Sequence, residues 1–378
     1  MTVAENYAER RNRLRCSVEA GAIVLFGLSS IRYFTGFSGS NALLWIDSFA
    51  ADNDVLITDA RYTLQAFAEC PGIAVESCSA RGSAALTEVS ETRHLHANTL
   101  GVDGEFLNWL DYQELAAWLS SCTQQDLTSA GMMEGLSDVS AYIAQLRSVK
   151  DRSEISALNQ AAQCAEAALE QLIDEHALVP GATESEVAAR LDYLMKVRGS
   201  EGVSFETIVG TGANSALPHH SPDNTPIAAG DLVVIDFGAV VRGYHSDCTR
   251  TFCVGDSTAW QEEIADCVWH AHQAALAVVR PGVSAGALDE AARAVINDAG
   301  YGPYFGHSTG HGVGVDIHEH PWVRSGSSEE LVAGSVFTIE PGIYLPERGG
   351  VRIENTYVLE DSGNVRSLQA LSAELLHV

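Results

Sequence analysis

Short apolar runs bounded by polar turns alternate with helical patterns in the first part of the chain. Strands are predicted at Ala22–Gly27, Asn41–Ile46 and Asp54–Thr58, because each run is apolar and rich in residues that favour β-structure. The spacing of apolar residues predicts an amphipathic helix near residues 5–19 and a second helix over Leu107–Leu119. This pattern is typical of a small α/β domain.

The second part carries a weak internal repeat. A charged connector, Leu146–Ile155, opens a long alanine-rich helix. The segment Pro180–Arg190 resembles Pro281–Arg293: in each, a Pro-Gly pair ends one helix, and Thr183 or Ser284 can cap the next. Apolar strand patterns follow each copy, so we expect a duplicated helix–helix–hairpin unit. Coincidence between two alanine-rich helices is the alternative.

A chain of 378 residues is too long for one ordinary core, so two domains are expected. We put their boundary at the charged connector, which gives domains at 1–145 and 146–378. The segment Met1–Arg15 is too charged for a signal peptide, and no uninterrupted apolar stretch approaches the roughly 20 residues of a membrane span. A cytoplasmic protein is therefore predicted.

Composition narrows the classes of partner. A formal net charge of −28 argues against nucleic acid and against an anionic membrane surface. Of the 22 basic residues only Lys150 and Lys196 are lysines; salt adaptation and a GC-rich genome both account for this bias. The eight cysteines contain no C-x-x-C pair and are expected to be reduced thiols.

One carboxylate interrupts an apolar run. Asp236 lies within Leu232–Val241, and a buried carboxylate is costly unless it is paired or binds a cation. Asp247 follows eleven residues later. A hairpin with Val241 and Arg242 at its turn sets Asp236 directly opposite Asp247. Cross-strand Cβ atoms are roughly 4.5–5.5 Å apart, so both carboxylates can hold the same ion.

A second hairpin is built in the same way downstream. Strand patterns at 338–344 and 350–356, folded about Glu347, bring Glu340 opposite Glu354. Two hairpins then present two facing pairs of acids.

A histidine in a glycine-rich segment completes the set. His311, in Gly310–Gly314, supplies a nitrogen ligand. Four carboxylates and one imidazole suit two divalent ions roughly 3.5–4 Å apart, an arrangement used for hydrolysis. The predicted ligands are Asp236, Asp247, His311, Glu340 and Glu354. The alternative, that these acids are surface residues of two hairpins, is disfavoured by the apolar run around Asp236.

These motifs resemble the pita-bread metallopeptidases, which include methionine aminopeptidase, aminopeptidase P and prolidase. The matching segments of the second part are Ile235–Gly238, Ser246–Arg250, Gly310–Gly314, Ile339–Gly342 and Val351–Glu354. In the first part, Ile31–Ser40 and Leu56–Gln65 look like the amino-terminal domain of Xaa-Pro peptidases and creatinase, which methionine aminopeptidases lack. The resemblance implies an α/β (α+β) chain with a creatinase-type N-terminal domain and a pseudo-symmetric pita-bread catalytic domain.

The resemblance also implies roles for the ligands. Asp236 would chelate one ion, Asp247 and Glu354 would bridge both, and His311 with Glu340 would hold the second. Two ions would activate a shared water to attack the scissile carbonyl, and Glu340 would carry its proton. An oxygen-rich ligand set favours Mn over Co or Zn.

Three further histidines match positions that line the site in the family without binding metal. His219, His307 and His318 would steady the substrate carbonyl, the gem-diolate or the departing nitrogen; structural or surface histidines are the alternative. His220 is expected to be exposed. A regular strand would put His311 and His318 on opposite faces, but the neighbouring glycines permit a bulge.

The resemblance implies cleavage of the bond before proline. Arg352 would orient site carboxylates, or be a plain surface arginine. A dipeptidase must also bind the substrate carboxylate, usually with an arginine, which in one prolidase group follows a His-Glu-x-Pro segment. Here Trp322 follows His318–Pro321; it would wall the proline pocket or simply pack, and Arg324 could substitute for the missing arginine.

We therefore predict an Xaa-Pro aminopeptidase that acts on peptides with proline in second position, with an Xaa-Pro dipeptidase as the alternative. A homodimer is expected by analogy. Gly306–Gly310 matches the G-x-S-x-G elbow of serine hydrolases, but no helical pattern follows it, which disfavours a Ser308 nucleophile. A metal-dependent hydrolase or lyase of a non-peptide substrate is less favoured. So is a non-catalytic binding protein, because the ligand set is intact.

Overall fold

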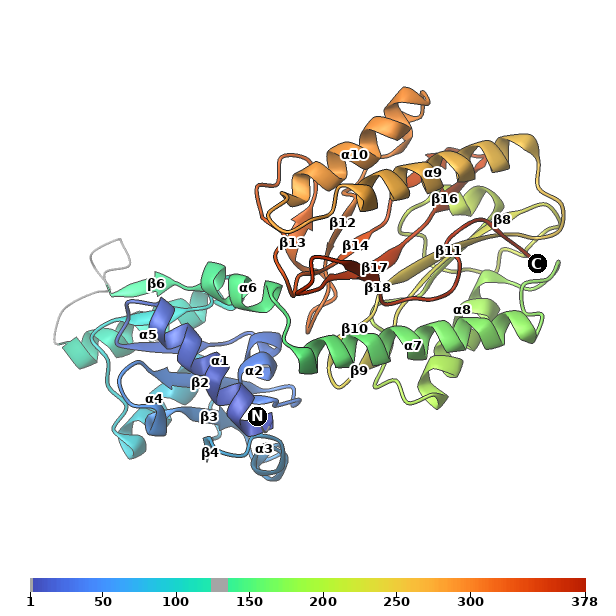
Figure 1. Cartoon of the computed structure of the whole chain (residues 1–378). Helices are drawn as coiled ribbons and strands as arrows, with labels where there is room; N and C mark the ends of the chain where they lie inside the picture. Colours follow the sequence, from blue (N-terminus) through green and yellow to red (C-terminus); the bar gives the residue numbers. More distant parts are fainter. Residues whose placement is uncertain (1–2, 124–134) are drawn as a thin grey trace. The chain divides into compact units, whose positions relative to one another are not determined.

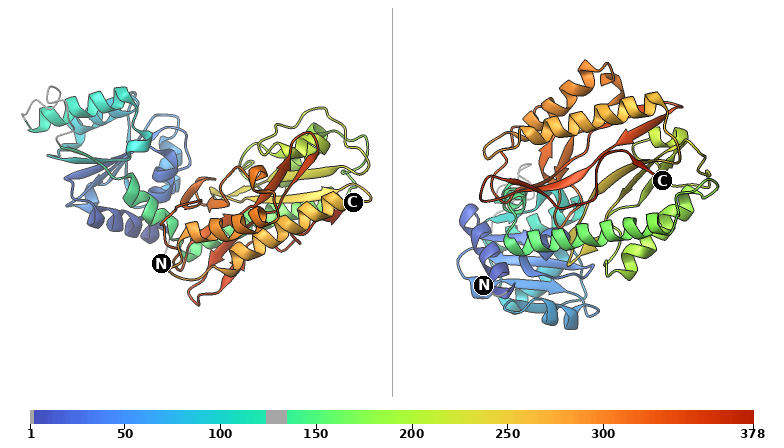
Figure 2. Two further views of the ribbon diagram at one scale, coloured as in Figure 1. Left: turned by 90° about the horizontal axis from the view of Figure 1, so that it is seen from above. Right: turned by 45° about the vertical axis from the view of Figure 1, so that its right-hand side comes forward.

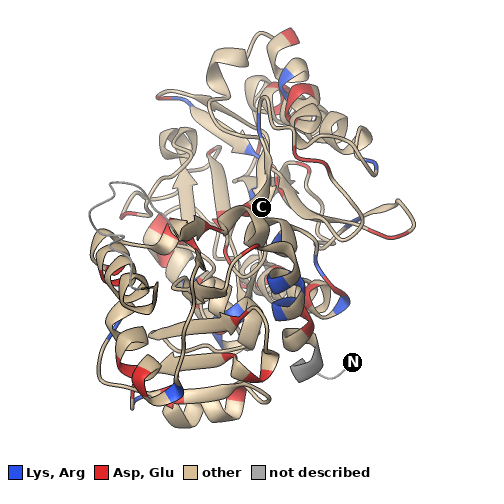
Figure 3. Cartoon of the chain, turned by 90° about the vertical axis from the view of Figure 1, so that its left-hand side faces the viewer, with Lys and Arg blue, Asp and Glu red and all other residues tan. Residues whose placement is uncertain are grey.

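The computed structural model describes residues 3–123 and 135–378, which divide into two compact units (Figure 1). Unit 1 is Met1–Arg147 and unit 2 is Ser148–Val378. Over the described residues, no helix has the length and apolar character needed to cross a membrane. All eight cysteines are free thiols. The acidic residues, which outnumber the basic ones by 50 to 22, are spread over helices and loops of both units (Figure 3).

Unit 1 is built on a mixed six-stranded sheet with the order β4-β3-β2-β1-β5-β6. Its strands are β1 (Ala22–Leu25), β2 (Ala42–Asp47), β3 (Val55–Thr58), β4 (Ala74–Ser77), β5 (Leu100–Val102) and β6 (Leu136–Asp138). The β1–β2 and β2–β3 pairs are antiparallel, and the other pairs are parallel. The three predicted strands are confirmed as β1, β2 and β3.

Helices accompany this sheet in the order expected of an α/β unit. They are α1 (Val3–Ser17), α2 (Leu28–Thr35), α3 (Thr63–Glu69), α4 (Ser83–Arg93), α5 (Trp109–Thr123), α6 (Ser140–Ser148) and the short 3₁₀ helices η1 (Ala51–Asn53) and η2 (Gly104–Phe106). The two predicted helices are confirmed as α1 and α5. Trp45 and Trp118 meet edge to face in the core, with ring centroids 5.8 Å apart.

Unit 2 has two similar halves, each a pair of helices packed on strands (Figures 1 and 2). The helices are α7 (Arg152–Asp174), α8 (Glu184–Val197), α9 (Ala259–Ala277), α10 (Ala285–Asp298), η3 (Gly212–Ala216) and η4 (Gly302–Tyr304). In the first half, α7 and α8 pack on a four-stranded sheet with the order β19-β11-β8-β7. In the second, α9 and α10 pack on a five-stranded sheet with the order β13-β12-β14-β17-β18.

The strands of unit 2 form these two sheets and two further hairpins. The sheet strands are β7 (Ile208–Thr211), β8 (Leu232–Phe237), β11 (Cys248–Cys253), β12 (Gly310–Gly312), β13 (Glu319–Val323), β14 (Val336–Ile339), β17 (Asn355–Leu359), β18 (Val365–Ser367) and β19 (Leu376–His377). The hairpin strands are β9 (Val240–Val241), β10 (Tyr244–His245), β15 (Gly342–Leu345) and β16 (Gly349–Arg352).

The predicted repeat is confirmed by matching backbone hydrogen bonds at the two Pro-Gly turns. The Gly181 N–H donates to the carbonyl of Ile227 at 2.9 Å, and the Gly282 N–H donates to the carbonyl of Leu331 at 2.8 Å. Both glycines adopt positive φ angles, +96° and +78°, a conformation that glycine reaches without steric cost. Each turn is therefore tied to a strand-like segment of its own half.

The two predicted helix caps behave differently. Thr183 begins α8, where its Oγ1 accepts the Glu186 N–H and the Glu186 carboxylate accepts the Thr183 N–H. Ser284 begins α10 without a side-chain capping bond. Asp151 caps the long helix α7 through a reciprocal bond with Glu154, and such a cap contributes about 1 kcal/mol.

The register predicted for the first hairpin is wrong by two residues. Asp236 lies opposite Thr249, not opposite Asp247. The turn residues are Arg242 and Gly243, with φ angles of 53° and 74°. A two-residue hairpin turn of this type needs positive φ at both positions, which favours glycine at the second. Because the slip is two residues, side chains keep their face, and Asp247 still lies diagonally across from Asp236.

The second hairpin has the predicted register. β15 and β16 pair Gly342 with Arg352 about a turn in which Glu347 has a φ of 61°. The β14–β17 ladder, which pairs Ile339 with Asn355, continues the same register. Glu340 and Glu354 fall opposite each other in the gap between these two ladders.

Candidate metal centre

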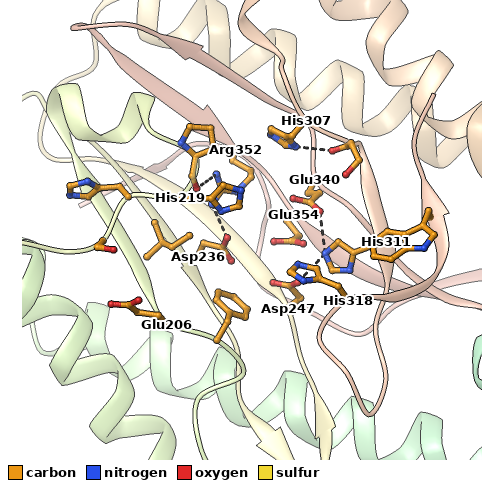
Figure 4. Close-up of a pocket in the computed structure, with 17 residues that line it drawn as sticks. Glu206, His219, Asp236, Asp247, His307, His311, His318, Glu340, Arg352 and Glu354 are labelled. Carbon is orange, nitrogen blue, oxygen red and sulfur yellow. Dashed lines mark hydrogen bonds and ion pairs between the residues drawn. The ribbon is translucent and has the colours of Figure 1, made fainter. Parts of the chain in front are cut away.

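A cavity of ≈510 Å³ in unit 2 is lined by side chains from both halves (Figure 4). Of the residues that the sequence predicts for the site, those that line the cavity are His219, Asp236, Asp247, His307, His311, His318, Trp322, Glu340, Arg352 and Glu354. Arg324 does not line it. Ser308 does, but strand β12 follows it instead of a helix, so the elbow of a serine hydrolase is not formed.

The imidazole of His311 faces two carboxylates. Its Nε2 atom lies 3.4 Å from Asp247 Oδ2 and 3.3 Å from Glu340 Oε1. Its Nδ1–H donates to the carbonyl of Gly312 at 3.0 Å, which fixes the ring with Nε2 directed at the carboxylates. Asp247, His311 and Glu354 each offer one ligand atom within 4.8 Å of the others. Such a group suits a cation.

A β-bulge brings His318 beside His311. β12 and β13 pair His311 with Trp322, and the register shifts between His311 and Gly312. The His311 and His318 rings therefore meet edge to face, with centroids 4.4 Å apart, although their spacing along the chain is odd. Close backbone approach explains the flanking glycine: a Cβ atom at Gly312 would lie 2.1 Å from the carbonyl oxygen of His320.

Burial and like charges raise the pKa values of two of the acids. Burial, followed by the neighbouring carboxylates, holds the pKa of Asp247 and that of Glu354 well above their ordinary values. Burial also opposes ionisation of Glu340, but the hydrogen bond to His311 and the charge of that ring outweigh it and lower the pKa of Glu340 to about 2.

Two buried oxygens give a direct test of whether a cation fits. Asp236 Oδ1 and Glu354 Oε1 have no hydrogen-bond partner among the described residues. Buried polar atoms in native proteins are paired, and an unpaired carboxylate oxygen calls for an ion or water. The second oxygen of each carboxylate is already engaged, Asp236 Oδ2 by Arg352 and Glu354 Oε2 by Thr249. The donor set and its unpaired oxygens fit divalent cations.

Arg352 connects the Asp236 carboxylate to His307 through the hydroxyl of Tyr344. Its Nη2 donates to Asp236 Oδ2 at 2.7 Å, and its Nη1 donates to the Tyr344 hydroxyl at 2.9 Å. That hydroxyl lies 2.9 Å from His307 Nε2, while His307 Nδ1 donates to the carbonyl of Ser308. Arg352 is thus buried and paired with a site carboxylate, as predicted, and is no surface residue.

Tyr344 and Thr249 also contact the site residues, but neither was predicted from the sequence. The register of the second hairpin could have placed Tyr344 near Arg352. Gly342 pairs with Arg352, and Tyr344, two residues further along the same strand, has its side chain on the same face. Thr249 could be found only with the correct register, which sets it opposite Asp236. It donates to Glu354 and accepts a hydrogen bond from Arg352.

His219 lies at the rim of the cavity on the loop that follows η3 (Figure 4). Its neighbour His220 is not simply exposed, contrary to expectation. The His220 side chain is 10% exposed, and its Nε2 donates to the fully buried Glu184 at 2.6 Å. Nothing in the sequence linked Glu184 to this loop.

Trp322 forms part of the wall next to His311. Its indole N–H donates to His320 Nε2 at 3.2 Å, and His320 Nδ1 donates to Glu329 at 2.7 Å. The Arg324 guanidinium lies 5.8 Å from the centre of the Trp322 ring. These contacts fix the indole and turn Arg324 toward its face.

Comparison with known proteins agrees with this geometry. Residues 156–361 match the model of metallopeptidase family M24, and residues 10–149 match the creatinase/prolidase N-terminal domain. The chain belongs to metallopeptidase family M24. It is an enzyme of a family that binds divalent metals, and its catalytic portion holds a group of side chains able to ligate them.

Relatives that are named as different kinds of peptidase match most of the chain. The Xaa-Pro dipeptidase of Pyrococcus furiosus is 39% identical over 281 residues, which is 74% of this chain and 76% of the relative. The structure of an Xaa-Pro dipeptidase from Bacillus anthracis has a TM-score of 0.87 at 32% identity and covers 99% of this chain and 100% of its own. An X-Pro aminopeptidase from Thermotoga maritima has a TM-score of 0.85 at 32% identity, covering 98% and 99%.

These findings confirm the predicted fold class, a creatinase-like N-terminal domain with a pita-bread catalytic domain. They also confirm a metallopeptidase. Dipeptidase and aminopeptidase relatives superpose about equally well on this M24 chain, so the length of its peptide substrate is a separate question.

Proposed function

We propose that this M24 enzyme is an Xaa-Pro aminopeptidase, which hydrolyses the bond between an N-terminal residue and proline with two divalent ions. One observation carries the proposal: five ligand-type side chains and three histidines converge on one cavity of ≈510 Å³. The unpaired oxygens of Asp236 and Glu354 support a site that needs cations.

The proposed ligands are Asp236, Asp247, His311, Glu340 and Glu354. When bound, two such ions lower the pKa of a water and polarise the scissile carbonyl. Mn is proposed ahead of Co or Zn, because four of the five ligands supply oxygen.

The chain's own residues hold the substrate and move protons. Glu340 accepts a proton from the attacking water at its carboxylate and passes it to the leaving nitrogen. His219, His307 and His318 line the cavity, and we propose that they hydrogen-bond the substrate carbonyl and the leaving group. Arg352 favours the ionised form of Asp236 and orients it through a 2.7 Å bond.

The preference for longer peptides rests on Trp322. An indole ring cannot offer the charge-assisted hydrogen bonds that a free substrate carboxylate needs, and the neighbouring Arg324 faces the indole instead of the cavity. A chain that continues beyond proline presents a neutral amide here, which costs far less to place against an apolar wall than a charged carboxylate does.

An Xaa-Pro dipeptidase is the second candidate. It is favoured by the relative from Pyrococcus furiosus, which is an Xaa-Pro dipeptidase. The Mn-loaded protein should be incubated with Gly-Pro, Ala-Pro and an Xaa-Pro peptide of four or more residues. The proposal expects cleavage of the longer peptide at the Xaa-Pro bond, and cleavage of the dipeptides alone would overturn it.

Trp322→Arg gives a sharper form of this test. The new guanidinium supplies the missing cation, so the ratio of kcat/KM for Ala-Pro to that for the longer peptide should rise about tenfold or more. Arg324→Ala, which alters the same neighbourhood without changing the wall, is the matched control and should leave the ratio unchanged. A ratio that falls in Arg324→Ala would reassign carboxylate binding to Arg324.

The remaining predictions are proposed on the same basis. A catalytic domain at 146–378 after an N-terminal domain at 1–145 is supported by the compact units and by the two matched family models. The homodimer and the cytoplasmic location stay predictions. Light scattering on the purified protein and fractionation of the native cells check them.

A further inference from the structure

The side chain of His219 is not fixed by bonds of its own. Over the described residues, no hydrogen bond or ion pair holds its ring, and the residue is exposed at the rim of the cavity. A catalytic group must be held close to its productive position, because a displacement of about 1 Å can cost on the order of 100-fold in rate. The loop that carries His219 must therefore supply the order that the ring lacks.

One flank of His219 is tied to the site itself. The carbonyl of Pro218 accepts a hydrogen bond from Arg352 Nη1 at 3.3 Å. Arg352 also donates to Asp236, so this flank moves with the acids.

The other flank is tied to one buried carboxylate. Glu184, at the first turn of α8, is fully buried. Its Oε2 accepts His220 Nε2 at 2.6 Å and the Asp223 N–H at 3.2 Å. Its Oε1 accepts the Thr211 N–H at 2.7 Å and Asn214 Nδ2 at 3.0 Å. Four donors from the segment 211–223, which runs from the end of β7 through η3 and the loop after it, thus converge on the Glu184 side chain from both sides of His219.

A metal site at this point is the competing interpretation, because Glu184, His220 and Asp223 have ligand atoms within 4.8 Å of one another. The hydrogen bonds that Glu184 accepts argue against a metal site. Both oxygens of Glu184 already accept N–H donors, and a cation would have to displace them. A carboxylate that is buried and saturated by a loop's own donors serves to fix that loop.

We propose that Glu184, acting through His220, is a positioning residue for His219: it holds the loop at 211–223 so that the His219 ring meets the substrate. This rests on the proposed function of His219. Because His219 is assigned to the reacting carbonyl, the effect belongs in kcat and not in metal affinity.

Glu184→Gln is the first test. The amide keeps the size of the side chain but replaces one acceptor oxygen with a donor, so the loop loses at least one bond. Turnover of the Mn-loaded enzyme on the longer Xaa-Pro peptide should fall 10- to 100-fold in kcat, with Mn stoichiometry and affinity unchanged. The amide protons of Thr211 and Asp223 should exchange faster with solvent.

Two variants control for general destabilisation. Glu186→Gln makes the same change from acid to amide and removes a favourable charge from the same first turn of α8 without touching the loop, and it should leave kcat unchanged. His220→Gln keeps a donor for Glu184 and should retain most activity, whereas His220→Ala should resemble Glu184→Gln. Equal losses in Glu186→Gln and Glu184→Gln would overturn the inference.

A double variant separates this inference from the proposed function. If Glu184 acts through His219, adding Glu184→Gln to His219→Gln should cost little more than His219→Gln alone. Losses that multiply would overturn the positioning role and leave the function of His219 intact. An unchanged kcat in His219→Gln, by contrast, would remove the proposed role of His219 itself.

Discussion

Glu340 differs from the other carboxylates of the cavity in its immediate partner. Its Oε1 lies 3.3 Å from His311 Nε2, and this contact lowers its pKa to about 2, whereas burial and like charges raise the pKa values of Asp247 and Glu354. The Glu340 carboxylate is therefore ionised, as the proton-carrying role proposed for it requires.

Replacement of Glu340 should therefore stop the reaction. Glu340→Gln keeps an oxygen ligand but cannot accept a proton, so kcat on the Xaa-Pro peptide should fall by about 10²–10⁴; Glu340→Ala should abolish turnover. Glu347→Gln, in the exposed turn of the same hairpin, is the control and should be silent. Metal analysis of each variant checks the ion content. Full activity of a metal-loaded Glu340→Gln would remove the assigned role.

At the scale of elements, periodicity predicted which side chains share a face better than it predicted which residues pair. The acids at 340 and 354 were placed correctly because the turn about Glu347 fixes their register. The first hairpin slipped by two residues because Gly243, which readily takes a positive φ, sits one position beyond the assumed turn. The predicted faces of the side chains were still correct, because a shift of two residues is one full period of a strand.

Contacts between distant segments could not be predicted from the sequence. Glu184 reaches the loop at 211–223, and Tyr344 connects Arg352 to His307. Such contacts depend on how helices dock on strands, which no local pattern encodes. The buried pair of Lys150 and Glu319 belongs to the same class.

That pair offers a test at the element scale. Lys150 Nζ donates to Glu319 Oε1 at 2.6 Å with none of the lysine side chain exposed. Glu319 begins β13 directly after His318. Lys150→Met leaves a buried carboxylate without its cation, so the free energy of unfolding should fall by about 3–5 kcal/mol. Urea denaturation measures this.

The other lysine of the chain is the matched control. Lys196 is exposed on α8 and donates to the carbonyl of Glu201, so Lys196→Met should change the free energy of unfolding by less than about 1 kcal/mol. Adding Glu319→Gln to Lys150→Met removes the negative charge of the buried carboxylate and should recover part of the loss. Strictly additive losses would contradict this account of the pair.

At the scale of the whole catalytic unit, the two halves use polar groups differently. The first half ties a loop to Glu184, whereas the second buries a histidine under its helices. His272 on α9 is 1% exposed, stacks on Trp269 and lies 3.2 Å from the Tyr357 hydroxyl through Nε2. Burial, followed by the charge of Arg250, lowers the pKa of His272 to about 3.

This depressed pKa makes stability depend on pH. An unfolded histidine titrates near 6.5, so between roughly pH 6.5 and pH 3 the unfolded chain binds a proton that the folded chain does not. The stabilising effect of neutral His272 is complete above that range and is lost as the pH falls. From pH 7 to pH 5 this one group should lower the free energy of unfolding by about 2 kcal/mol.

His272→Gln isolates the effect. Glutamine can still meet the Tyr357 hydroxyl but takes up no proton, so its free energy of unfolding should decline less steeply from pH 7 to pH 5, by about 2 kcal/mol relative to the unaltered protein. His270→Gln, two residues earlier and exposed on the same helix, is the matched control for the substitution itself. Urea titrations at the two pH values measure both slopes. If His272→Gln and the unaltered protein lose stability in parallel, His272 is protonated in the folded state, and the acid sensitivity of the unit lies with other groups.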